Sequence, residues 1–139
     1  MFRFIISIII CLLATTLYAA EPVNTEVKET ITTNSGLQYT SSKEGTGATP
    51  GPTDTVKVNY RGTLLNGREF DSSYNSRRPA EFQLNSVIKC WSEGLQMMKV
   101  GGKAKLVCPS NLAYGEDGIV GSVPRYSVLI FEVELLDIK

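Results

Sequence analysis

The stretch VIKCWSEGLQMMKVGGKAKLVC, residues 87–108, joins a short helical pattern to a strand pattern and contains the single tryptophan of the chain. Apolar side chains recur at helical spacing in its first half, at Trp91, Leu95 and Met98. Gly101 and Gly102 then end the helix. The second half, KAKLVC, alternates polar and apolar residues, as a half-buried strand does. The stretch therefore predicts one short amphipathic helix followed by a strand.

Patterns on both sides of this stretch predict further strands. In VKVNYR, residues 56–61, two valines and Tyr60 share one face while the polar residues share the other. Asn66 and Gly67 follow as a hairpin turn. Further extended segments are GLQY (36–39), EFQL (81–84) and VLIFEVELLDI (128–138). Several antiparallel strands with one short helix predict an α+β domain, in which the helix packs on the apolar face of a curved sheet.

The first 35 residues differ from the rest of the chain. Residues 1–20 have one basic residue, then an apolar run, then two alanines, which is typical of a secretory signal peptide. The competing interpretation is an uncleaved membrane anchor, but the apolar run is shorter than the ~20 residues that span a bilayer. Residues 21–35 are polar and rich in threonine, so we expect a flexible lead-in. The organised domain is expected at residues 36–139, in an exported protein.

Composition excludes several classes of function. Removal of Arg3 with the signal peptide leaves 14 − 1 = 13 basic residues against 14 acidic ones, a balance that argues against nucleic-acid binding. The chain has no histidine, which excludes hydrolytic triads that use this residue and most zinc sites. Glycine-rich nucleotide signatures are also absent from the sequence. We therefore expect neither a metal nor a cofactor.

Two cysteines, Cys90 and Cys108, lie outside the predicted signal peptide. In an exported protein they are either joined in a disulfide or buried as free thiols, and the sequence leaves both alternatives open. A thiol oxidoreductase is disfavoured because their spacing is far from C-x-x-C.

A group of aromatic and branched side chains lies outside or at the ends of the predicted elements. Packing in the core explains any single one of them. The set comprises Tyr60, Phe70, Val87, Ile88, Trp91, Tyr114 and Phe131.

Four separated motifs support a second interpretation of these side chains, in which they line a binding site. VKVNYRGTLLNGREFDSS, VIKCWSEGLQMMKVGGKAKL, LAYG and LIFEVELLDI occur in an order and at spacings that resemble the FKBP-type peptidyl-prolyl cis-trans isomerases. The resemblance covers residues 36–139. It implies a curved five-stranded antiparallel sheet wrapped around one short helix, and isomerisation of X-Pro bonds during the folding of exported proteins.

The resemblance also implies an apolar proline slot. Its floor is Trp91, whose indole N–H is expected to find a hydrogen-bond partner at one edge. Tyr114 would offer its hydroxyl to a substrate carbonyl, and the backbone N–H of Ile88 resembles the second donor of the family. The other residues carried over are Tyr60, Phe70 and Phe131 as walls, Val87 beside Ile88, and Val123 on a loop that overhangs the slot.

Asp71 in FDSS matches the acidic residue of the family slot. It has an equally good structural interpretation, in which it fixes Tyr60 or Arg68 and never meets substrate.

The sequence departs from the family pattern at Ala80, where many members have an aromatic residue, and at Pro124-Arg125 in place of a double proline. Because of Ala80 we expect a more open slot and weaker binding of macrolide inhibitors. The change at Pro124-Arg125 concerns the rim contacts of the loop and the sequence preference, and leaves the floor intact. Larger exported relatives carry a helical dimerisation arm. In this sequence about fifteen polar residues precede the domain instead, so a monomer is expected.

Expected partners are proline-containing unfolded or nascent exported polypeptides, with the periplasm as the expected location. The rival function is a chaperone module that binds proline without significant turnover.

Overall fold

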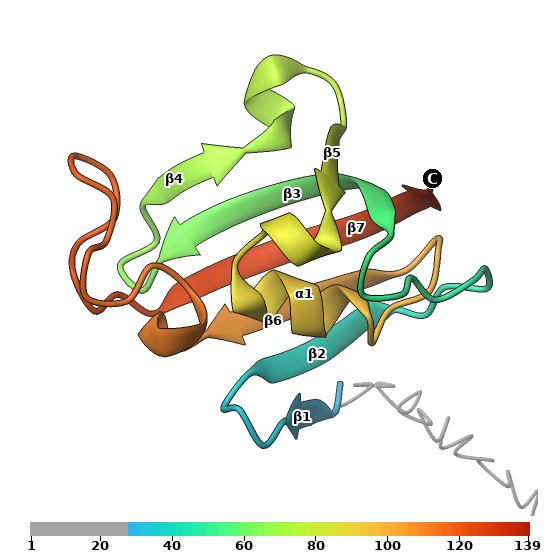
Figure 1. The fold of residues 1–139 in the computed structure, drawn as a ribbon, viewed down its shortest axis with the longest axis horizontal. Helices are drawn as coiled ribbons and strands as arrows, with labels where there is room; N and C mark the ends of the chain where they lie inside the picture. Colours follow the sequence, from blue (N-terminus) through green and yellow to red (C-terminus); the bar gives the residue numbers. More distant parts are fainter. Residues whose placement is uncertain (1–27) are drawn as a thin grey trace, which may run out of the picture.

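The computed structural model describes residues 28–139, so the predicted signal peptide and the first part of the lead-in, residues 21–27, lie outside the described residues. Within residues 28–139, seven strands form one antiparallel sheet, and one α-helix lies across a face of it (Figure 1). The strands are β1 (Thr30–Thr32), β2 (Gln38–Lys43), β3 (Thr55–Leu64), β4 (Glu69–Ser72), β5 (Ala80–Gln83), β6 (Lys103–Cys108) and β7 (Leu129–Ile138). The helix is α1 (Lys89–Leu95), and three short 3₁₀ helices are η1 (Ser73–Ser76), η2 (Leu84–Ser86) and η3 (Ser110–Leu112).

The strand order β1-β2-β6-β7-β3-β4 places the two ten-residue strands, β3 and β7, side by side. β5 pairs with the first half of β3 and β4 with its second half, because η1 interrupts this edge. The α+β class is confirmed, but the sheet has seven strands among the described residues instead of five. The divided edge and the additional β1 account for the difference.

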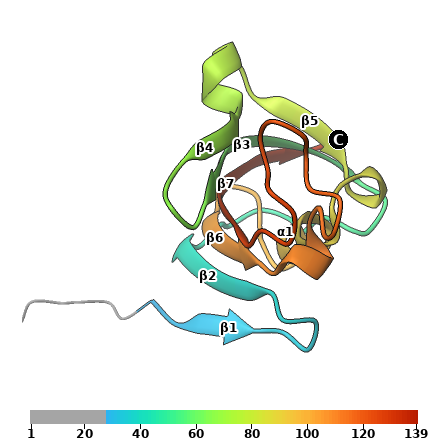
Figure 2. The same ribbon diagram turned by 90° about the vertical axis from the view of Figure 1, so that its left-hand side faces the viewer.

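β1 lies inside the segment that was expected to be a flexible lead-in. Its three residues pair with residues 38–40 of β2, and all three are exposed. Figure 2 shows β1 at the edge of the sheet, away from the helix. Main-chain hydrogen bonding to a free strand edge needs no apolar alternation, so this strand has no hydrophobic pattern in the sequence. The expectation of a lead-in without regular structure is therefore wrong for residues 30–32.

The apolar face of the sheet and the helix enclose the core. Val56, Val58 and Tyr60 are buried, and the polar residues between them are only partly so, as the alternation predicts. The predicted hairpin turn is also present: Gly67 has a φ of 85°, and the Leu64 N–H donates to the Arg68 carbonyl at 2.9 Å. A positive φ of this kind favours glycine.

α1 is shorter than the sequence pattern indicates. It ends at Leu95, and the backbone then turns, with Met98 N–H donating to the Leu95 carbonyl at 3.2 Å. Gly101 has a φ of 91° and donates to the Leu135 carbonyl of β7 at 2.8 Å, so the chain uses residues 96–102 to turn back into the sheet. Trp91, Leu95 and Met98 are nevertheless all buried. No helix in residues 28–139 is long and apolar enough to cross a membrane.

Candidate active site

A cavity of about 270 Å³ lies beside the first turn of α1. Side chains from β3, β4, β5, α1 and β7 surround it, together with residues next to η2 and η3. Its lining is mostly apolar, and its members are Tyr60, Phe70, Asp71, Phe82, Ser86, Val87, Ile88, Trp91, Tyr114 and Phe131. We call this cavity the slot.

Aromatic rings around Trp91 give the slot its shape. The rings of Tyr60, Phe82 and Phe131 meet the indole edge-on, with centroids 5.0, 5.3 and 5.4 Å away and interplanar angles of 86°, 84° and 86°. Edge-to-face pairs are favoured by the ring quadrupoles, each by about 0.5–1.5 kcal/mol beyond area burial. The indole is therefore held as a floor between upright walls, which suits a small saturated ring.

The indole N–H of Trp91 does not act as expected from the sequence. Trp91 Nε1 is buried and has no hydrogen-bond partner in the part of the chain that the structure describes. The partner expected at one edge of the ring is therefore missing among the described residues. Its contribution to the slot is its apolar surface.

Tyr60 and Asp71 form the main polar pair of the slot. Tyr60 Oη donates to Asp71 Oδ2 at 2.7 Å, and Asp71 Oδ1 accepts from the backbone N–H of Ser72 at 2.9 Å. Burial raises the pKa of Tyr60, and the hydrogen bond and negative charge of Asp71 raise it further. Asp71 thus fixes the Tyr60 wall, and it also lines the slot.

Tyr114 lies after η3 and is half-buried. Burial raises the pKa of its hydroxyl, and the charge of Asp71 adds to this effect. The phenol is therefore protonated at physiological pH and can donate a hydrogen bond.

Ile88 lies at the entrance to α1 with an extended backbone, φ −57° and ψ 150°. Its carbonyl accepts from the backbone N–H groups of Trp91 and Ser92 at 3.0 and 3.2 Å. The start of the helix therefore fixes Ile88 beside the tryptophan floor.

The structure brings together all but one of the residues that the sequence assigned to the slot. The exception is Val123, which is buried in the hydrophobic core cluster, and whose N–H and carbonyl pair with the backbone of Ile119 at 2.9 and 2.8 Å. Val123 lines a different surface hollow, together with Arg68 and Asp117. Val123 is not part of the slot lining, so its assignment to the slot is not supported.

Two residues of the slot were not assigned from the sequence. Phe82 lies on β5 and Ser86 in η2. The alternation in EFQL was a usable signal for Phe82, since it placed the ring on one face of an extended segment. Ala80 lies on the same face of β5 by strand alternation, but it is not part of the lining.

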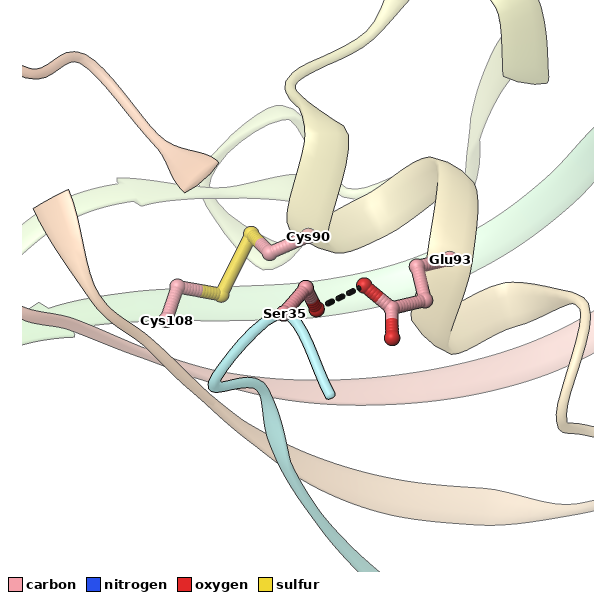
Figure 3. The surroundings of a disulfide bond; sticks show 4 residues. All are labelled: Ser35, Cys90, Glu93 and Cys108. Atoms are coloured by element: carbon pink, nitrogen blue, oxygen red, sulfur yellow. Dashed lines mark hydrogen bonds between the residues drawn. A yellow bond between two sulfur atoms is a disulfide. The ribbon is translucent and has the colours of Figure 1, made fainter. Parts of the chain in front are cut away.

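Cys90 and Cys108 are joined by a disulfide that connects α1 to β6 (Figure 3). Their Cα atoms are 5.8 Å apart, and both residues are fully buried. A buried bond cannot exchange with a protein thiol, so the thiol oxidoreductase remains disfavoured. Among residues 28–139, no group of three or more His, Cys, Asp or Glu side chains is arranged to hold a metal ion.

Known proteins resemble the chain over most of its length. The profile of the family described as "FKBP-type peptidyl-prolyl cis-trans isomerase" matches residues 46–136. The FkpA isomerase of Aeromonas hydrophila is 57% identical over 107 residues, which are 77% of this chain and 40% of the relative. FkpA of Escherichia coli K12 is 51% identical over 108 residues, 78% of this chain and 40% of the relative.

Solved structures agree with this similarity. The crystal structure of FkpA from Escherichia coli matches with a TM-score of 0.76 and 49% identity, covering 79% of this chain and 51% of that one. The structure of AtFKBP13 matches with a TM-score of 0.73 and 34% identity, covering 78% and 98%. The chain thus spans less than half the length of these curated FkpA relatives.

Proposed function

Because the chain belongs to the FKBP-type peptidyl-prolyl cis-trans isomerase family, we propose that the slot binds a proline and accelerates rotation about the peptide bond that precedes it. The observation that carries this proposal is the floor of Trp91 between three upright rings. Such a shape accepts a compact, saturated five-membered ring.

An apolar slot favours the rotation for a physical reason. Twisting a peptide bond costs ~18–20 kcal/mol because it breaks the resonance between the carbonyl and the nitrogen. The twisted amide is less polar than the planar one, so an apolar environment disfavours the planar ground state more strongly. This is selective binding of the transition state, and it needs neither a nucleophile nor a cofactor. Uncatalysed X-Pro isomerisation takes tens to hundreds of seconds, which leaves room for such an enzyme.

Polar groups at the rim would orient the substrate. We assign to Tyr114 Oη the role of donor to a substrate carbonyl, supported by its place in the lining and its raised pKa. The N–H of Ile88 is the proposed second donor. Asp71 holds the Tyr60 ring upright through their hydrogen bond, which keeps the wall in place when substrate enters.

The proposed substrates are proline-containing unfolded or nascent polypeptides. Residues 1–20, with their signal-peptide pattern, support export of the protein, and we propose the periplasm as its location. The expectations of a monomer and of weak macrolide binding stay predictions.

A second candidate function is that of a chaperone module, which binds proline-containing segments in the same slot without turnover. Its basis is the apolar lining, which serves binding as well as catalysis. The two functions differ in stoichiometry, because an enzyme acts many times and a binder is consumed.

The test is the refolding of a protein limited by proline isomerisation, with the chain present in large molar deficit. We expect acceleration by the parent protein and a clear loss in Tyr114→Phe. Tyr126→Phe is the matched control, because Tyr126 is exposed and outside the slot lining. Acceleration only near equimolar amounts would favour the binding module, and equal activity of both variants would contradict the role of Tyr114.

A further inference from the structure

The disulfide links two segments of the slot. One segment carries its floor, Trp91, and the other carries Tyr114, which lines the slot from another side. Cys90 is in the first turn of α1 and directly precedes Trp91. Cys108 is the last residue of β6, and the chain runs from it through η3 to Tyr114. Figure 3 shows the bond bridging the helix and the strand.

α1 has few means of holding its own first turn. The helix has seven residues, its N-cap Ile88 provides no side-chain hydrogen bond, and its first turn has no acidic residue. Helices this short are marginal in isolation and depend on tertiary contacts. The position of its first turn therefore depends on tertiary contacts with the sheet, which include the rings packed against Trp91 and the disulfide at Cys90.

A further close contact between α1 and β6 lies in the second turn of the helix. A Cβ built on Gly94 would come within 2.8 Å of the Leu106 side chain, so the two are in tight contact. This contact anchors the second turn of the helix. The disulfide anchors the first turn, which is the turn that carries Trp91.

The segment after Cys108 is fixed by its own hydrogen bonds. Leu112 N–H donates to the Pro109 carbonyl at 3.0 Å, and the N–H groups of Ala113 and Gly115 donate to the Ser110 carbonyl at 3.0 and 2.8 Å. Tyr114 lies between these last two donors. The wall that it forms is thus tied closely to Cys108.

A turn from the start of the domain packs against both linked segments. Ser35 Oγ donates to Glu93 of α1, and a Cβ on Gly36 would lie 3.6 Å from the side chain of Pro109. Figure 3 shows Ser35 and Glu93 near the bond. With both cysteines fully buried, the bond is protected in the folded protein.

We infer that Cys90 and Cys108 are positioning residues of the slot, an inference that rests on the proposed isomerase function. Their bond holds the first turn of α1 so that Trp91 and Ile88 keep their distance from Tyr114. Without the bond, the sheet and the second turn of the helix stay folded, while the floor shifts relative to the wall. A shift of about 1 Å at a catalytic site lowers rates by roughly 100-fold in unfavourable cases.

The test compares the parent with the double variant Cys90→Ala/Cys108→Ala. Leu135→Ala is the matched control, because it removes a fully buried side chain from β7 that is outside the slot lining. Far-UV circular dichroism confirms folding of each protein at the assay temperature. The readouts are kcat/KM for a proline peptide and the near-UV circular dichroism at the long-wavelength edge of the tryptophan band, where tyrosines and the disulfide contribute little and the signal reports the surroundings of Trp91.

We expect the folded double variant to lose roughly tenfold or more in kcat/KM and part of its tryptophan signal, with Leu135→Ala losing neither. A folded double variant within twofold of the parent in kcat/KM overturns the inference. If the parent protein is inactive, the result contradicts the proposed isomerase function. The positioning role is then judged from the tryptophan signal, and an unchanged signal in the double variant overturns it. If the double variant does not fold, the single variant Cys90→Ser in the same measurements replaces it.

Discussion

The substitution Gly62→Ala tests whether the rings of Phe70 and Phe131 form the walls of the slot. Gly62 lies in β3, and a Cβ on it would come within 2.7 Å of Phe70 Cζ and 2.8 Å of Phe131 Cε1. Ordinary contacts of a Cβ begin at 3.4 Å, so the Phe70 ring must move by 3.4 − 2.7 = 0.7 Å. Both rings line the slot, and displacement away from β3 brings them into it.

The expected magnitudes follow from this displacement. Overpacking costs about 1–3 kcal/mol of stability. The lower entropy of the unfolded chain with alanine offsets about 0.4–1 kcal/mol of that cost. The net loss in the free energy of unfolding is therefore at most about 2.6 kcal/mol. We expect a loss of roughly tenfold in kcat/KM as well, because ring displacement narrows the site where the proline lies.

The assay is a protease-coupled isomerisation measurement beside equilibrium denaturation. Gly67→Ala is the control: Gly67 has a φ of 85°, so alanine is strained there, but nothing lies within 4 Å of its Cβ. We expect this control to lose about 1–2 kcal/mol of stability and to keep its activity. A folded Gly62→Ala protein with the same kcat/KM as Gly67→Ala would refute the assignment of the two rings as walls.

Three further outcomes are expected. Removing the disulfide with Cys90→Ala/Cys108→Ala should lower the free energy of unfolding by about 3 kcal/mol in chemical denaturation, because the bond closes a loop with a separation of 18 residues; unchanged stability would contradict this. The pKa of Tyr60 is raised in the folded state, so its stabilising contribution is complete below about pH 10 and is lost as the pH rises further. The free energy of unfolding, measured by denaturation at increasing alkaline pH, should therefore fall less steeply in Tyr60→Phe than in the parent. An identical slope in the two proteins would count against this role of Tyr60. Phe82→Leu should lower kcat/KM severalfold by removing one upright wall, and full activity would show that this ring is dispensable.

The sequence predicted most of the sheet, because alternation reports directly which strand face is buried. Val56, Val58 and Tyr60 occupy the apolar face of β3 as expected. β1 could not be predicted in this way, since all three of its residues are exposed and its pairing with β2 buries no apolar face. The end of α1 was also misplaced, because the pairing of Gly101 with β7 is a tertiary contact that helical spacing does not contain.

The site was predictable to the extent that motifs marked it. The tryptophan floor and most walls came from the resemblance, and the structure brings them together. Val123 is buried in the core cluster and is not part of the slot lining, a placement that the motif spacing did not contain. The pairing of Cys90 with Cys108 stayed open because only the folded chain shows that their Cα atoms lie 5.8 Å apart.

The most direct measurement is two-dimensional NMR exchange spectroscopy on a short proline peptide, with the full chain present at a small fraction of the peptide concentration. This experiment observes the cis and trans forms interconvert and needs no coupling enzyme. Trp91→Leu, verified as folded, removes the aromatic floor and serves as the comparison. The account predicts strong exchange peaks with the parent and much weaker ones with Trp91→Leu. Exchange no faster than in the free peptide with a folded parent, or equal exchange with the two proteins, would contradict it.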